Sequence, residues 1–63
     1  MIEDFARVLR EKLREEAETE IRGLARGAAK DFSGYQYSCG VVRGLELAEQ
    51  IVIDLRNAAE SAE

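Results

Sequence analysis

The side chains that could carry out chemistry in this 63-residue chain are few and widely separated. The chain has no histidine, the side chain whose charge changes most readily near neutral pH. Cys39 is its single thiol, and one cysteine forms neither an internal disulfide nor a zinc site. A lone cysteine is more often a small buried hydrophobic residue than a reactive one. The sequence therefore predicts neither a nucleophile–base pair nor a metal centre.

Acidic side chains in the second half, namely Glu46, Glu49 and Asp54, are the remaining candidates for catalysis. Carboxylates act as general acid and base when they converge and their environments push their pKa values apart. Nothing in the spacing of these three indicates convergence, and no glycine-rich phosphate loop follows a strand. A chain this short also has no core in which to form a substrate pocket. We expect no enzyme, no catalytic residue, no cofactor and no small-molecule substrate.

Basic residues gather around the middle of the chain. Arg22, Arg26 and Lys30 follow one another at intervals of four, and Arg43 lies in the turn-proximal part of the second half. Two interpretations stay open: compensation of a helix dipole, since bases stabilise a helix C-terminus, or contact with an acidic partner. The net charge of −4 argues against general binding of nucleic acid. The opposite end of a hairpin would be acidic, through Glu3, Asp4, Asp54, Glu60 and Glu63.

Composition points to one small helical domain over residues 1–63. The chain has no proline, 35% charged residues and 6% aromatic residues, which is typical of long helices. The segment Met1–Arg10 lacks the apolar run of a signal peptide, and no stretch approaches a membrane span. With its free thiol, the chain is expected to be a soluble intracellular protein with no membrane partner.

The first half of the sequence has the periodicity of an amphipathic helix. Its other faces are densely charged, and pairs such as Arg14–Glu18 have the i, i+4 spacing that stabilises helices. Gly27 could end this helix in a left-handed conformation, or the helix could continue, so we place its end between Arg26 and Lys30. The apolar face consists of Ile2, Phe5, Leu9, Leu13, Ala17, Ile21, Leu24 and Ala28.

Two sequence signals name Ser33 as the N-cap of a second helix. Ser33 and Gln36 have the spacing of a capping box, and Phe32 and Tyr37 have the spacing of a hydrophobic staple. We therefore expect Ser33→Ala to lower stability by about 0.5–2 kcal/mol.

A heptad-type pattern, typical of coiled coils, continues from that start. Two helices of similar length joined by a short loop must lie antiparallel. The sequence thus predicts an all-α fold, a two-helix antiparallel hairpin with helices at about 2–28 and 33–60. The heptad positions are Val41, Leu45, Ala48, Val52, Leu55 and Ala59.

Small residues recur every four positions on the second helix, at Gly40, Gly44 and Ala48. A glycine costs up to about 1 kcal/mol inside a helix, so two on one face indicate a close neighbour. That neighbour is either the first helix, within the hairpin, or another chain. If the packing is close, Gly44→Leu should destabilise the fold or its assembly by roughly 1–3 kcal/mol.

The second helix is apolar on more sides than one neighbouring helix can cover. Leu47 and Ile51 form a second stripe beyond the heptad positions, and Val42 and Ile53 form a third. A chain this small, without a disulfide or a metal, has little core of its own. We expect the hairpin to complete its core by oligomerisation or by docking on a partner. The residues predicted to pack against that partner are Gly40, Gly44, Val42, Leu47, Ile51 and Ile53.

The stretch Asp31–Leu55 reads D-F-x-x-Y-x-x-x-C-G-x-x-R-G-L-x-x-A-x-x-x-x-x-D-L. It resembles small helical proteins of unknown function that tailed bacteriophages encode, often near genes for virion assembly. The resemblance covers the second half of the chain, implies a phage context, and supplies no catalytic or binding residues. It rests on Asp31, Phe32, Tyr35, Gly40, Gly44, Leu45, Ala48, Asp54 and Leu55.

Two functions follow as hypotheses. The first is a non-enzymatic interaction module, a small phage structural or assembly protein that packs through the second helix. Its partner would be a copy of itself or a larger phage structural protein, in the host cytoplasm or incorporated in the virion. The alternative is a small phage regulatory protein that binds a host or phage enzyme and modulates it. Nucleic-acid binding through the basic turn is a third interpretation.

Overall fold

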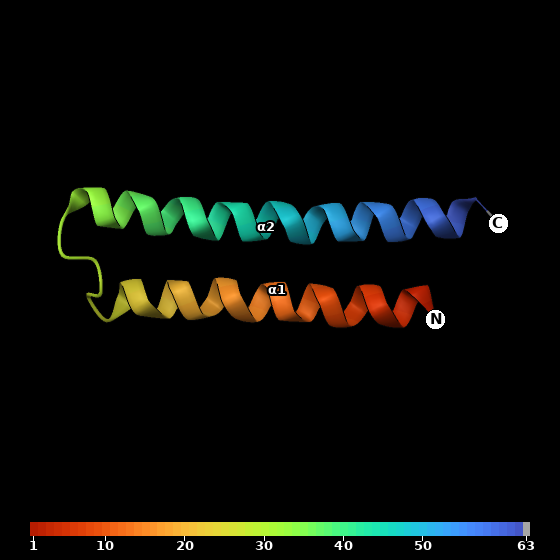
Figure 1. Ribbon diagram of the computed structural model, residues 1–63, viewed down its shortest axis with the longest axis horizontal. Coiled ribbons are helices and arrows are strands. Elements are labelled where there is room, and N and C mark those ends of the chain that lie inside the picture. The colour runs from red at the N-terminus through yellow and green to blue at the C-terminus, as the bar shows by residue number, and fades with distance from the viewer. Residues whose placement is uncertain (63) are drawn as a thin grey trace.

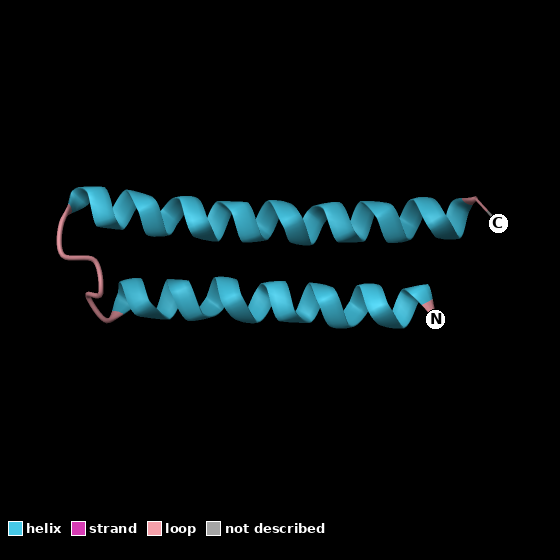
Figure 2. Cartoon of the chain, in the orientation of Figure 1, coloured by secondary structure: helices cyan, strands magenta, loops and turns pink. Residues whose placement is uncertain are grey.

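The computed structural model describes residues 1–62 and consists of two helices that pack side by side in opposite directions (Figure 1). Helix α1 spans Ile2–Ala25 and helix α2 spans Phe32–Ser61, and the described residues contain no strand (Figure 2). Both chain ends lie at one end of the molecule, and the connecting loop lies at the other (Figure 1). The all-α antiparallel hairpin predicted from the sequence is confirmed. Neither helix has a described stretch long and apolar enough to cross a lipid bilayer.

Helix α1 ends earlier than the predicted bound at residue 28. Gly27 has a φ of 82°, a left-handed conformation that glycine adopts at little cost. The amide of Gly27 donates to the carbonyl of Leu24, and the amide of Ala28 donates to that of Gly23, each at 3.0 Å. These two bonds form a Schellman motif, which satisfies carbonyls at the helix end. The helix therefore stops at Ala25, with Arg26 as its C-cap.

Gly23, in the last turn of α1, has room for a side chain. A Cβ there would lie 3.8 Å from the Cβ of Ala28, an ordinary van der Waals contact. We expect Gly23→Ala to raise the free energy of unfolding by roughly 0.5–1 kcal/mol, because alanine is the better helix former. The matched variant Gly27→Ala should lower it by roughly 1 kcal/mol, because its backbone is left-handed. Urea unfolding followed by circular dichroism measures both, and a less stable Gly23→Ala protein would contradict this account.

The N-cap of α2 is Asp31, so the prediction of Ser33 was wrong. Asp31 has an extended backbone, and its Oδ1 accepts a hydrogen bond of 2.7 Å from the amide of Gly34. Ser33 lies inside the first turn, where it cannot form a capping box with Gln36. A carboxylate also interacts favourably with the positive end of the helix dipole, which favours Asp31 over the serine. Phe32 also has a different aromatic partner from the one predicted. It stacks on Tyr35, and not on Tyr37, with ring centroids 6.4 Å apart.

Because Asp31 is the N-cap, the loss of stability on removing the cap is expected at Asp31 and not at Ser33. Asp31→Ala should lower the free energy of unfolding by about 0.5–2 kcal/mol, because the Gly34 amide loses its acceptor. Ser33→Ala, at an exposed position two residues away, should change it by less than about 0.5 kcal/mol. Thermal and urea unfolding of the two variants, measured in parallel, test this ordering. The reverse order would restore Ser33 as the cap.

The most deeply buried side chains between the helices are small. Ala17 is 1% exposed and Ala6 is 9% exposed, and they are the buried hydrophobic residues of the described chain. Helix α2 has no buried residue, although Leu45 and Ala48 are half-buried. Alanines let two helices approach closely but remove little apolar area from water. The hairpin therefore has a thin core.

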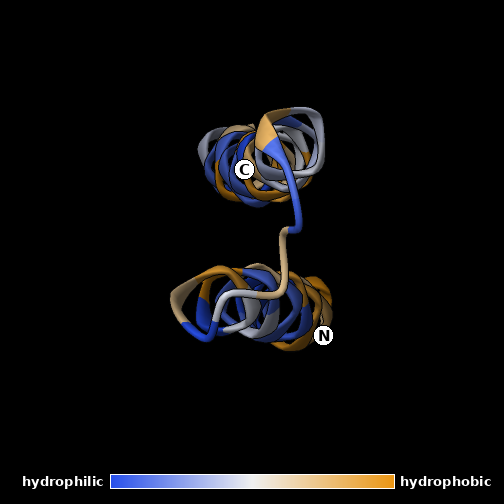
Figure 3. Cartoon of the chain, turned by 90° about the vertical axis from the view of Figure 1, so that its left-hand side faces the viewer, coloured by the Kyte–Doolittle hydropathy of each residue, from blue (hydrophilic) through white to orange (hydrophobic). Residues whose placement is uncertain are grey.

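The bulky residues of the predicted α1 face lie at its edge. Phe5 is 69% exposed and Ile21 is 43% exposed, while Leu13 and Leu24 are half-buried. On α2 the heptad pattern holds except at Leu55, which is 65% exposed. Hydrophobic residues colour both flanks of α1 when the hairpin is viewed from the turn (Figure 3). Ala6 and Ala17 thus face α2, Leu13 and Leu24 are partly covered, and the larger side chains nearer the edge remain exposed.

Candidate interaction surface

An exposed apolar stripe runs along one flank of α2. Its members are separated by three or four residues, which places them on one side of a helix. Tyr37 is 74% exposed, Leu47 63% and Ile51 49%, and no charged residue interrupts the series. We call it the α2 stripe, and it consists of Tyr37, Gly40, Gly44, Leu47, Ile51, Leu55 and Ala58, all of them exposed.

The two glycines of the α2 stripe do not accommodate α1. A Cβ built at Gly40 or Gly44 meets nothing within 4 Å, so the hairpin leaves open space beside both. Because each residue advances a helix by about 100°, Gly44 and Gly40 lie roughly 100° and 140° around α2 from Leu45, which is half-buried on the side facing α1. The interpretation that the first helix requires these glycines is therefore wrong. A role in contact with another chain stays a prediction.

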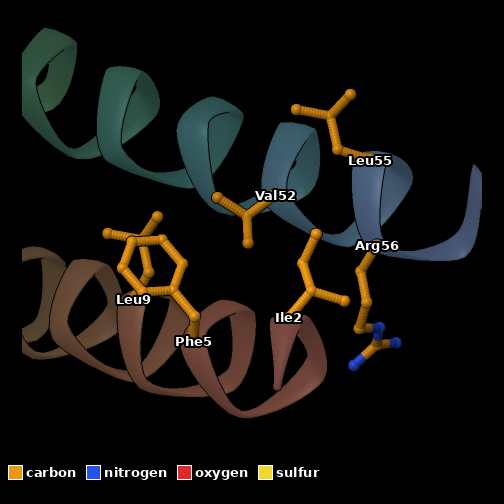
Figure 4. A pocket seen from close by; sticks show the side chains of 6 residues that line it. All are labelled: Ile2, Phe5, Leu9, Val52, Leu55 and Arg56. Atoms are coloured by element: carbon orange, nitrogen blue, oxygen red, sulfur yellow. The ribbon is translucent and has the colours of Figure 1, made fainter. Parts of the chain in front are cut away.

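At the open end of the hairpin, the α2 stripe continues into an apolar groove between the helices. The groove has a volume of about 190 Å³. Ile2 and Val52 point toward one another across it, and Leu55 lies at its rim (Figure 4). The Nε of Arg56 is buried and has no hydrogen-bond partner among the described residues. The groove is lined by Ile2, Phe5, Leu9, Val52, Leu55 and Arg56.

The six residues predicted to pack against a partner lie on two flanks. Gly40, Gly44, Leu47 and Ile51 belong to the exposed α2 stripe. Val42 and Ile53, by contrast, are half-buried. They lie toward the opposite flank, because an offset of two residues turns a helix through about 200°. The structure brings the first four together with Tyr37 and the groove, which the sequence did not identify as parts of one surface.

A polar cluster joins the helices near their middle. The Nη2 of Arg14 donates a 2.6 Å hydrogen bond to Oε1 of Glu49, and its Nη1 lies 3.9 Å from Oε2 of Glu46. The bonded Glu49 carboxylate raises the pKa of Arg14 above its ordinary value, so the guanidinium stays protonated. Glu46 and Glu49 therefore converge, contrary to expectation, but on an arginine. The predicted helical partner of Arg14 was Glu18, because sequence spacing cannot reveal pairing across a hairpin.

The turn end holds the remaining candidates. Tyr35 is 49% exposed and Cys39 is half-buried, and the interaction between their side chains raises the pKa of the Tyr35 phenol above its ordinary value. The four bases predicted as a contact for an acidic partner, Arg22, Arg26, Lys30 and Arg43, are all exposed. They give the turn end a positive charge.

The chain was compared with known proteins in three ways. No protein-family model, no curated protein and no solved structure matches the chain. The exposed α2 stripe and its groove are therefore the features that indicate a function.

Proposed function

We propose that this hairpin is a non-enzymatic protein–protein interaction module whose α2 stripe is covered by another chain. The observation that carries the proposal is the contrast between a core of two buried alanines and a long row of exposed large apolar residues. Covering one leucine or isoleucine of the stripe would contribute about 1.5–3 kcal/mol. A chain this small rarely obtains more than about 3–5 kcal/mol from its own core. The free energy gained by covering a few such residues is therefore comparable to the free energy of unfolding of the whole hairpin.

Ordinary surface exposure explains this pattern less well. Single apolar residues scattered over a surface are common and need no partner. Here Leu47, Ile51 and Leu55 lie on consecutive turns, and Leu55 also lines the groove formed with α1. A continuous apolar surface of this kind is typical of sites where proteins bind one another.

Light scattering after size exclusion at micromolar concentration, with melting curves at several concentrations, tests the proposal. We expect association and a melting temperature that rises with protein concentration, because binding stabilises the folded state. A monomer that melts above about 60 °C, independently of concentration, would contradict the proposal, because it needs no partner to fold.

We further propose that the module is a small phage structural or assembly protein. The support is the resemblance carried by Asp31–Leu55 together with the exposed α2 stripe, which suits packing in an assembly. Mass spectrometry of purified virions should find the chain at many copies per particle. Its absence from particles, with recovery on one host or phage enzyme, would favour the regulatory alternative.

A further inference from the structure

Charge is separated along the hairpin. Residues 22–43, which include the turn, hold four bases and one acid, whereas residues 1–21 and 44–63 together hold five bases and twelve acids. Two hairpins side by side in the same direction would place basic turn against basic turn and acidic end against acidic end. Reversing one of them places each basic turn beside an acidic end, which complementary charge favours. The charge distribution therefore favours an antiparallel over a parallel arrangement of two copies.

Along the α2 stripe, small and large residues are ordered so that two copies running in opposite directions complement each other. Tyr37 and Leu55 lie near its two ends, and Gly44 and Leu47 lie at its middle. If a two-fold axis passes between positions 44 and 47, Gly44 of one copy lies opposite Leu47 of the other. Gly40 then lies opposite Ile51, and Tyr37 reaches Leu55 and the groove. A small residue thus meets a large one at each central position, which is the self-complementarity that a two-fold interface requires.

In this antiparallel arrangement, the groove of one copy would receive the Tyr37 ring of the other. Its lining is apolar, through residues such as Phe5 and Val52, and Tyr37 is the most exposed aromatic side chain of α2. A tyrosine combines an apolar ring with a phenol oxygen that accepts hydrogen bonds. The buried Nε of Arg56, at the groove, is a donor without a described partner.

We propose that the α2 stripe binds a second copy of this chain in an antiparallel two-fold dimer, with Tyr37 of each copy in the open-end groove of the other. This inference rests on the proposed function and names its partner. The separation of charge along the hairpin and the order of small and large residues along the α2 stripe both favour this occupant.

Disulfide cross-linking distinguishes this geometry from others. In a Cys39→Ser background, cysteine is introduced singly at Gly40, Gly44 or Ile51, and each variant is oxidised mildly at micromolar concentration. A disulfide requires Cα atoms within about 7 Å, and positions 51 of two antiparallel copies would lie roughly 16 Å apart along the helices. We expect Gly44→Cys to form covalent dimers by itself. Gly40→Cys and Ile51→Cys should cross-link only when mixed. Circular dichroism confirms that each variant folds.

The outcomes separate this inference from the proposed function. Cross-linking of Gly40→Cys and of Ile51→Cys each with itself would show a parallel dimer and overturn the antiparallel geometry. A Cys39→Ser parent that light scattering shows to be a dimer, but whose variants do not cross-link, would overturn the assignment of the stripe while leaving the interaction function intact. A parent that stays monomeric overturns the second copy as partner. If that monomer also melts above about 60 °C at every concentration, the proposed function fails with it.

Discussion

Replacing Ala17 by leucine is expected to lower the free energy of unfolding by about 1–3 kcal/mol. Ala17 is 1% exposed and faces α2 near the middle of α1, where an alanine allows the helices to pack closely. A leucine there must push the helices apart or adopt a strained rotamer, because packed interiors leave no space for three added carbon atoms. The separation would also strain the neighbouring Arg14–Glu49 hydrogen bond.

Urea unfolding of Ala17→Leu measures this effect, with Thr19→Leu as the matched control. Thr19 lies two residues further along α1 and is exposed, so the same leucine should change stability by less than about 0.5 kcal/mol. Equal stabilities for the two variants would show that α1 does not pack through Ala17. Within the hairpin, the clash expected from the sequence at Gly44 does not occur, because Gly44 has open space beside it. A clash of Gly44→Leu with a second chain stays a prediction.

Replacing Ile51 by lysine is expected to weaken self-association by about 10²- to 10⁴-fold. Ile51 is 49% exposed in the single chain and lies on the α2 stripe. Loss of one buried isoleucine costs about 1.5–3 kcal/mol, and a two-fold dimer loses two of them. A total of about 3–6 kcal/mol corresponds to that range of dissociation constants, at 1.4 kcal/mol for each factor of ten.

Sedimentation or light scattering over a range of concentrations gives the dissociation constants. The control is Gln50→Lys, which adds the same charge to the adjacent residue, an exposed position on another side of α2. It should leave association within a few-fold of the parent value. Equal weakening by both variants would show that net charge, and not coverage of the α2 stripe, controls association.

Local signals in the sequence were sufficient to predict the secondary structure and the hairpin. The three-and-four spacing of apolar residues, the absence of proline and the glycine at position 27 define two helices and one turn. Helix α2 begins one residue before the predicted bound, and α1 ends three residues before it. The cap was misassigned because Asp31 and Ser33, two positions apart, can both accept a hydrogen bond from a helix amide. Only the backbone path shows that Asp31 does so.

Part of the candidate surface was also predictable. Leu47 and Ile51 were identified because they fall outside the heptad positions, which a single neighbouring helix covers. Tyr37 was instead assigned to a staple at the start of α2, and so its place on the α2 stripe was missed. The groove was missed because its lining comes from the two ends of the chain, at Ile2, Phe5, Leu9 and at Val52, Leu55, Arg56.

By itself, the sequence determined that this protein is two helices in an antiparallel hairpin with more apolar surface than one hairpin can bury. Periodicity records which residues share a helix side, since each helix repeats every 3.6 residues. It does not record how far each helix rotates about its own axis when the two pack. The sequence placed Ala17 on the inner face, but only the tertiary structure decided that Ala6 is also buried, that Phe5 and Leu55 lie outside, and that Arg14 reaches Glu49. The physical reason is that close packing of backbones through alanines competes with burial of larger side chains, and the balance depends on both helices together.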